Sequence, residues 1–127
     1  MARHWWQNKQ HDIFVDRGDP VAYDFLVGDL TVNGVWQDLD LSTIVPVRAK
    51  AVLLMVTIQN AAAAKSIKFR KKDNVNDYNK ATLFSQVADT ALCADIIVAV
   101  NANRLIEYNA SNVAWVAISG VVKGWFM

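Results

Sequence analysis

The sequence predicts an all-β protein, a two-sheet antiparallel β-sandwich of the jelly-roll kind with an extended N-terminal arm. No stretch of about eleven residues carries apolar residues at the i, i+3, i+4, i+7 spacing of an amphipathic helix. Instead, about seven to nine short strand-like segments recur at intervals of roughly 8 to 14 residues. With 127 residues, of which 54% are hydrophobic, the chain can build one core. We therefore expect a single domain.

The first 21 residues predict an extended arm or a short strand that leads into the domain. They mix polar and aromatic residues, and they end in the turn-forming run DRGDP at positions 16–20. No linker rich in Gly, Ser or Pro interrupts the rest of the chain. The predicted organisation is therefore an arm over residues 1–21 and a sandwich over residues 22–127.

The first strands of the sandwich follow from alternating apolar residues. Residues 22–27 alternate before the Gly28-Asp29 break, and Asn33-Gly34 is a strong turn dipeptide. Residues 35–41 then alternate apolar side chains with Trp36 and two aspartates. This pattern predicts a strand with one apolar face and one acidic face, with Trp36 on the acidic side.

The middle of the chain predicts the centre of the sandwich. Residues 50–59 (KAVLLMVTIQ) are apolar on both alternating faces, which predicts a central strand covered on both sides. Residues 61–64 are four alanines, too few to repay helix nucleation, so we expect a tight loop there. Residues 66–70 alternate again, which predicts Ile67 and Phe69 inside and Lys68 and Arg70 in water.

Four further strands are expected in the second half, over residues 82–87, 95–100, 104–108 and 113–126. Gly120 and Gly124 interrupt the last of these segments. Glycine inside a strand usually marks a bulge or a sharp bend.

Charge and composition exclude several classes of partner. Thirteen basic and twelve acidic residues leave a formal charge of +1, too small to predict binding to nucleic acid. The longest apolar run, residues 51–58, is far shorter than the roughly 20 residues that a membrane-spanning helix needs. The first residues lack the pattern of a secretory signal, so we expect synthesis in the cytoplasm. The single cysteine, Cys93, predicts neither a disulfide within the chain nor a zinc site.

Catalytic residues are scarce. His4 and His11 are the only histidines, both in the predicted arm, and the sequence has no glycine-rich phosphate loop and no nucleophile elbow. Asp38 and Asp40 form a carboxylate pair, but acidic alternation on a strand more often marks a wetted face. We therefore predict no enzymatic activity, no cofactor and no metal site within one chain. A site shared by histidines of several chains stays open.

Short motifs are better explained as local structure. Arg17-Gly18-Asp19 spells an integrin-recognition tripeptide and Asn109-Ala110-Ser111 a glycosylation sequon, but both are also typical of simple turns. Asp73, Asn74, Asn76 and Asp77 lack the register of a calcium loop. The one basic concentration predicts a solvated strand and loop; it comprises Lys65, Lys68, Arg70, Lys71 and Lys72.

The aromatic residues are the best candidates for contacts. Trp5 and Trp6 lie outside the core pattern, and tryptophan is favoured at the centre of interfaces. We expect them, with His11 and Phe14, to contact a neighbouring subunit, with packing on the same subunit or ligand stacking as alternatives. Trp36 and Tyr108, together with Trp115 and Trp125, could instead form a platform for stacking sugars, or belong to the core and the sheet rim.

Five segments of the sequence carry a resemblance to known proteins: DRGDPVAYDF, GVWQDLDLSTIVPVRAKAVLL, FRKKDNVNDYN, ADIIVAVNANRLIEYNAS and the terminal VKGWF. In these segments the chain resembles small β-sandwich domains of tailed-phage and prophage structural proteins. This resemblance implies decoration, fibre or tail roles in a virion, often as trimers or larger assemblies. The loop at Lys72-Asp73 lacks the glycine of the resembled domains, so no loop-borne function is transferred.

Two functional hypotheses follow. The first is a non-enzymatic structural or attachment protein of a virion, which forms a homo-oligomer of three or more copies through its sandwich and its arm and can contact other virion proteins. The second is a carbohydrate-binding module that recognises surface glycans through exposed aromatic residues such as Trp36 and Tyr108.

Overall fold

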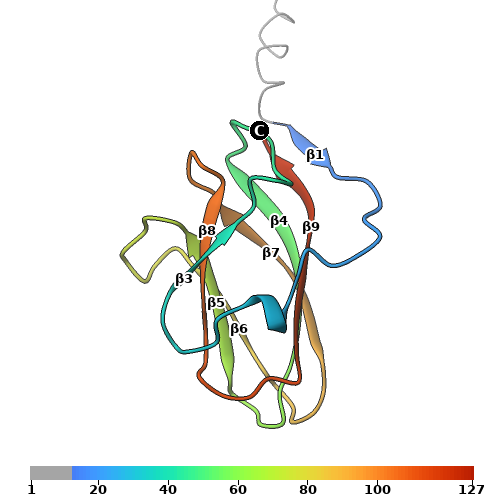
Figure 1. The fold of residues 1–127 in the computed structure, drawn as a ribbon, viewed down its shortest axis with the longest axis vertical. Helices are drawn as coiled ribbons and strands as arrows, with labels where there is room; N and C mark the ends of the chain where they lie inside the picture. The colour runs from blue at the N-terminus through green and yellow to red at the C-terminus, as the bar shows by residue number, and fades with distance from the viewer. Residues whose placement is uncertain (1–12) are drawn as a thin grey trace, which may run out of the picture.

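The computed structural model describes residues 13–127, and it confirms the β-sandwich. No α-helix occurs within this range; one 3-10 turn, Val27–Asp29, follows the second strand. The nine strands shown in Figure 1 are β1 (Phe14–Asp16), β2 (Phe25–Leu26), β3 (Gln37–Asp40), β4 (Ala51–Gln59), β5 (Ser66–Lys71), β6 (Ala81–Phe84), β7 (Leu92–Ala99), β8 (Leu105–Ala110) and β9 (Ala117–Phe126).

The strands form two antiparallel sheets with jelly-roll connectivity. One sheet has the order β1-β9-β4-β7, with β2 also paired to β9, and the other has the order β3-β8-β5-β6. The antiparallel pairs are nested in the chain, because β5 pairs with β6, β4 with β7, β3 with β8 and β2 with β9. Such nesting is what results when one long hairpin is rolled up, and it gives the two Greek keys of a jelly roll.

The core lies between the sheets and is built from alternate residues of each strand. Along β4, Val52, Leu54, Val56 and Ile58 are fully buried, as the period-two pattern of a strand requires. The facing sheet contributes Phe69, the largest of the fully buried side chains. The other buried apolar side chains are Phe25, Leu41, Val45, Ala49, Ile67, Leu83, Val98, Val100, Ile106, Tyr108, Ala110, Ile118 and Val122.

The second face of β4 is not covered in this chain. Residues 51, 53, 55, 57 and 59 are only half-buried, and they point away from the core. β4 is central in its sheet as predicted, between β9 and β7. The expectation that both of its faces are covered is wrong for a single copy, because the sandwich has two layers and nothing in residues 13–127 forms a third over this sheet.

Several strand limits differ from the sequence prediction. The expected strand over residues 22–27 shortens to β2, because the 3-10 turn follows at once and the Asp29 carboxylate accepts a hydrogen bond from the Leu26 N–H at 2.9 Å. β7 begins three residues earlier than predicted, at Leu92. β9 begins four residues later, at Ala117, because Trp115 donates from Nε1 to the Ser111 carbonyl (3.1 Å) and holds a loop.

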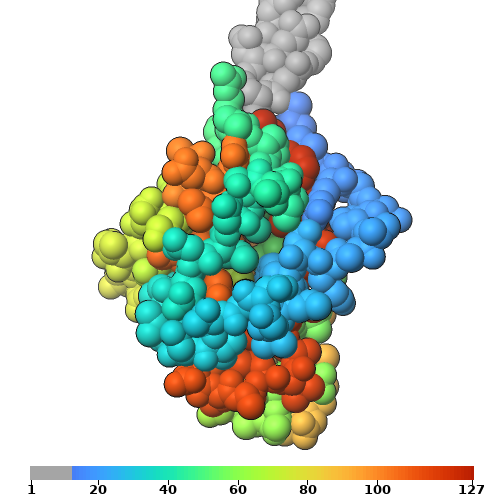
Figure 2. Space-filling view, viewed as in Figure 1, coloured from blue at the N-terminus to red at the C-terminus, as the bar shows by residue number. Residues whose placement is uncertain are grey.

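Part of the segment predicted as an arm or a short strand belongs to the sheet. Phe14–Asp16 form β1, which pairs with residues 124–126 of β9 in the same chain. The N-terminal end of β1 lies beside the C-terminus of the chain, at one end of the molecule (Figure 1). Figure 2 shows residues 17–45, coloured blue to teal, crossing one face of the molecule.

Gly120 and Gly124 are explained by aromatic rings that lie directly on β9. A Cβ atom at Gly120 would lie 2.1 Å from the Phe25 ring, and one at Gly124 would lie 2.4 Å from the Phe14 ring. The predicted bulge is also present, since the register of β9 against β4 shifts between Leu53 and Leu54, opposite residues 122–124. Close approach of a ring therefore accounts for glycine here as much as the bend does.

Candidate binding groove

An apolar groove lies on the outer face of the five-stranded sheet, and we call it the outer groove. Its volume is about 620 Å³. Its floor is the cross-strand pair Met55 of β4 and Val121 of β9, and its wall is the segment between β1 and β2. The lining residues are Asp16, Gly18, Pro20, Val21, Ala22, Tyr23, Leu26, Met55, Val121 and Lys123.

The wall of the groove is fixed at both ends. Arg17 donates its backbone N–H to the Lys123 carbonyl (3.0 Å), and Asp24 donates its own to the Gly120 carbonyl (2.8 Å). Between these points the Arg17 guanidinium pairs with the Asp24 carboxylate, which also accepts the Val122 N–H at 2.8 Å. Both side chains are largely removed from solvent, and their ion pair helps to hold the segment between β1 and β2 against β9.

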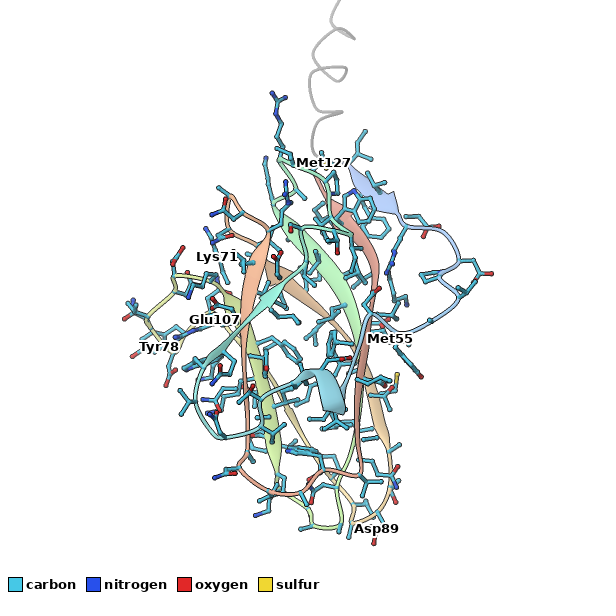
Figure 3. All side chains as sticks on the ribbon, viewed as in Figure 1. Met55, Lys71, Tyr78, Asp89, Glu107 and Met127 are labelled. Carbon is cyan, nitrogen blue, oxygen red and sulfur yellow. The ribbon has the colours of Figure 1, made fainter. Side chains whose placement is uncertain are left out.

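Within this fixed wall, apolar side chains are exposed to solvent. Val21 is fully exposed, and Tyr23 and Leu26 are each 51% exposed. Figure 3 places Met55 on the side of β4 and β9 that faces this wall. Lys123 supplies a polar rim and pairs with Asp95 at 3.0 Å. A contiguous apolar surface of this kind is a candidate contact site.

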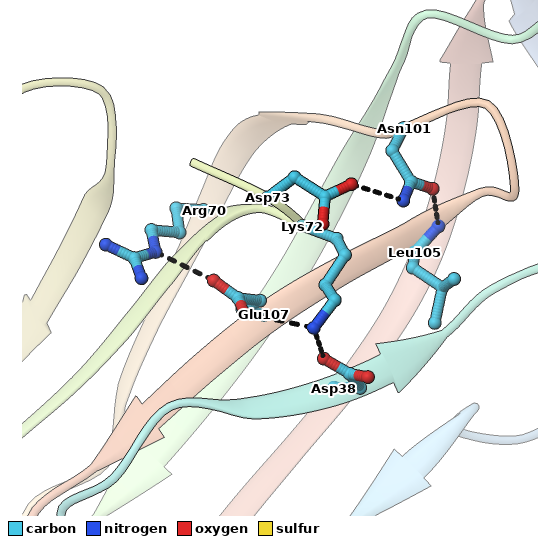
Figure 4. Close-up of polar contacts among 7 residues, drawn as sticks. All are labelled: Asp38, Arg70, Lys72, Asp73, Asn101, Leu105 and Glu107. Atoms are coloured by element: carbon cyan, nitrogen blue, oxygen red, sulfur yellow. Dashed lines mark hydrogen bonds and ion pairs between the residues drawn. The ribbon is translucent and has the colours of Figure 1, made fainter. Parts of the chain in front are cut away.

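The four-stranded sheet has a different outer face, formed by a network of ion pairs (Figure 4). Arg70 donates from Nε to the Glu107 carboxylate at 2.8 Å, and both side chains are about nine-tenths buried. Lys72 contacts Asp38 at 2.8 Å and the second oxygen of Glu107 at 3.5 Å. The hydrogen bond to Asp38 raises the pKa of Lys72 above its ordinary value of 10.5.

Arg70 also corrects a prediction from the sequence. Instead of standing in water, its guanidinium lies 3.9 Å from the centre of the Trp36 ring, a cation–π contact that helps to bury it. Trp36 does lie on the acidic side of β3, as predicted, but one face of its ring is occupied by Arg70.

The predicted sugar-stacking platform is not assembled. Tyr108 is 3% exposed and lies in the core, where its hydroxyl accepts the Thr31 N–H at 2.7 Å, so its selection as an exposed aromatic is wrong. Trp115 and Trp125 are partly buried against the same core. Trp36 alone of these residues lies on the outer face of the four-stranded sheet, and so the structure does not bring Trp36 and Tyr108 together on one surface.

Of the predicted interface residues, only Phe14 falls in the part of the chain that the structure describes. Its ring packs on Phe126 with centroids 5.1 Å apart and stays 39% exposed. Trp5, Trp6 and His11 lie outside the described residues, as does His4.

The short motifs take part in local structure. The Arg17 side chain is held by Asp24 and by the Val122 carbonyl, so the Arg17-Gly18-Asp19 turn does not present it to a receptor. Ser111 of the sequon accepts a hydrogen bond from the Ser66 N–H at 3.0 Å. Asp73 accepts a hydrogen bond from Asn101, and residues 13–127 hold no group of three side chains able to ligate a metal. Cys93 is exposed.

No protein-family model matches this chain, and no curated protein does. In residues 13–127 no helix is long and apolar enough to cross a membrane.

Sequence reasoning missed the outer groove, although the sequence held a signal for it. The two apolar faces of residues 50–59 indicated an apolar outer surface, and the cover assigned to it is absent from the single copy. The wall could not be predicted, because it depends on Asp24 reaching β9 at Val122, almost a hundred residues later in the chain.

Proposed function

We propose that the protein is a non-enzymatic structural or attachment protein of a virion, a decoration, fibre or tail component that works by self-assembly. The outer groove is the observation that carries this proposal, because it is an open, mainly apolar surface with a fixed wall. A jelly roll is compatible with this role, since capsid and lectin domains both use it, but the fold alone does not select a function.

The occupant that we propose for the groove is the Trp5-Trp6 segment of a neighbouring copy. Indole rings bury a large apolar area while their N–H groups can reach a polar rim, here Asp16 and Lys123. Trp6 precedes Ile13 by seven residues, a reach of up to about 25 Å in extended chain. Ile13 contacts Met127 through its carbonyl, and Val121 lies six residues from Met127, about 20 Å along β9.

A neighbouring groove fits this segment better than the groove of the same chain. β1 runs antiparallel to β9, so the chain approaches β1 from beyond the end of the sheet, on the side opposite to Val121. To reach its own groove the segment would have to reverse direction within seven residues, whereas a neighbouring copy requires no reversal. Head-to-tail contacts of this kind close into a ring when the rotation between copies allows it, and we propose such a ring of three or more copies.

Light scattering after size-exclusion chromatography tests the proposal. The full chain should have a mass at least three times 14.2 kDa, and Trp5→Ala with Trp6→Ala should lower it. Met55→Lys, which places a charge on the groove floor, should have the same effect. Tyr78→Ala is the matched control, because Tyr78 is 97% exposed and lies outside the groove. A wild-type mass of 14.2 kDa, or one insensitive to both changes, would contradict the proposal.

The carbohydrate-binding alternative is less well supported. Stacking a sugar on Tyr108 would require the core to open, and stacking on the occupied face of Trp36 would require displacing Arg70 from a buried ion pair. Titration with a panel of glycans, followed by tryptophan fluorescence, should therefore give no saturable change that depends on Trp36. A response lost in Trp36→Ala would restore this alternative.

A further inference from the structure

The free edge of β7 carries a second inference, independent of the outer groove. β7 is the last strand of its sheet and pairs only with β4 within residues 13–127. The Val100 N–H donates to the Lys50 carbonyl at 3.1 Å, which makes Ala51 and Ala99 a non-hydrogen-bonded pair. By alternation, the backbone N–H and C=O groups of Cys93, Asp95 and Ile97 therefore point away from β4, toward the free edge.

This edge has few of the devices that usually protect edge strands, since its one charged residue, Asp95, is paired with Lys123 on the same sheet. β7 is eight residues long and contains no proline, no lysine and no register shift against β4. The other edges are shorter, since β3 and β6 have four residues each and β1 and β2 are shorter still. A long, regular edge is a template for pairing with another strand.

Burial along β7 indicates where a partner strand would lie. Val98 is buried, but Leu92, Ala94 and Ile96, which point to the same side, are only half-buried. The first half of β7 therefore extends past the cover of the facing sheet. At the other end, Ile97, Val98 and Ala99 line a small cavity with Lys80 and Ala81, which leaves less room beside the edge. An added strand would fit best beside residues 92–96.

We propose that β7 pairs antiparallel with β7 of a second copy, across a two-fold axis at Ala94. In this register Leu92 lies opposite the partner's Ile96, so half-exposed apolar residues cover one another. Asp95 lies opposite the partner's Cys93 and keeps its ion pair with Lys123. Moving the axis by one residue toward the C-terminal end of β7 would place Asp95 opposite Asp95 of the second copy, and like charges directly opposed destabilise a sheet.

The pairing joins two five-stranded sheets into one continuous sheet. Cys93 and Asp95 each exchange two hydrogen bonds with their opposite residue, so the exposed edge groups are satisfied. The contact is isologous and therefore joins copies in pairs. It does not depend on the tryptophan contact proposed above, and the two together would build an assembly larger than either alone.

Disulfide trapping tests the register. Cys93 is the only cysteine, so Cys93→Ser gives a background without thiols. In Ala94→Cys on this background, the new cysteine would lie opposite the same cysteine of the second copy. The two form a non-hydrogen-bonded pair with Cα atoms about 4.5 Å apart, within the range of a disulfide. Mild oxidation with oxidised glutathione should give a covalent dimer. Asp95→Cys in the same background is the matched control, and we expect at least about tenfold less dimer from it, because the residue opposite it, at position 93, then carries no thiol.

Two further measurements guard against a folding artefact. In the unaltered protein, hydrogen exchange should show protected amides at Cys93 and Asp95, although neither amide donates a hydrogen bond to β4. Ala94→Lys, which opposes like charges at the axis, should lower the mass while circular dichroism shows an intact fold. Equal cross-linking at positions 94 and 95, or unprotected amides at Cys93 and Asp95, would overturn the proposal. Trp5→Ala with Trp6→Ala should leave the cross-link at position 94 intact, so a failure of the tryptophan contact can be told apart from a failure of the β7 pairing.

Discussion

Removing Glu107 alone should destabilise the protein much more than removing it together with Arg70. The two side chains form an ion pair at 2.8 Å on the outer face of the four-stranded sheet, and each is about nine-tenths buried. In Glu107→Met the Arg70 guanidinium would stay under Trp36 without its counter-charge and with Lys72 close by. The buried charge then has no partner to offset its lost hydration.

The expected magnitude follows from this burial. Breaking a buried ion pair costs about 3 to 5 kcal/mol, and the residual exposure of both groups places this pair at the lower end, about 3 kcal/mol. In a domain of this size that corresponds to a fall in Tm of about 10 °C. In the double variant Arg70→Met with Glu107→Met, two apolar side chains of similar length pack on Trp36 instead, so the free energy of unfolding should return to near the wild-type value.

Urea unfolding followed by circular dichroism measures both effects, with the slope of the transition as a check that the unfolded state is unchanged. Glu107→Gln is a useful third variant, because it removes the charge and keeps the shape. The reasoning would be refuted if Glu107→Met cost less than about 1 kcal/mol, as exposed pairs do. It would equally be refuted if the double variant were no more stable than Glu107→Met.

Three further predictions concern single side chains. Gly120→Ala should lower the free energy of unfolding by about 1 to 3 kcal/mol, because its Cβ would meet the buried Phe25 ring, whereas Gly28→Ala meets nothing within 4 Å and should be nearly neutral in the same urea titration. Tyr108→Phe leaves the Thr31 N–H without its acceptor and should cost about 1 to 2 kcal/mol in thermal unfolding; a neutral result would mean that water replaces the hydroxyl. Since the pKa of Lys72 is raised in the folded state, its stabilising effect should be complete below its ordinary pKa of 10.5 and be lost as the pH rises through the folded value. The Tm difference between wild type and Lys72→Met should therefore shrink at high pH, and a difference that grew would contradict this sign.

Much of the fold could be predicted because the alternation of apolar and polar residues along each strand shows which of its faces is buried. The alternation in residues 35–41 and 66–70 predicted the inward and outward faces of β3 and most of β5, since the side-chain period of a strand is two. Where prediction failed, the cause was a contact distant in sequence. Arg70 was expected in water because nothing near it in the chain shows that Trp36 and Glu107 enclose it.

The candidate sites were predicted less well, for a related reason. Tyr108 lies opposite Gln37, the neighbour of Trp36, but Tyr108 and Trp36 point to opposite faces of the sheet. A list of aromatic residues does not separate these faces, because an inward tyrosine with a satisfied hydroxyl and an outward aromatic look alike in sequence. The register of β8 against β3 decides between them, and register comes from the whole sheet.

The two outer faces of the sandwich are the strongest argument that the five-stranded sheet is a contact surface. On the four-stranded sheet, Arg70, Glu107, Lys72 and Asp38 form a connected network of ion pairs that satisfies these charged groups within one copy. On the five-stranded sheet the outward positions include the apolar residues Met55, Val121 and Ile97, beside the Lys123–Asp95 ion pair and the uncharged Thr57 and Gln59. Because the chain forms ion pairs on one outer face, charged residues could equally have occupied the other. The apolar residues of the second face are therefore better explained by a partner that covers them than by tolerance of an exposed surface.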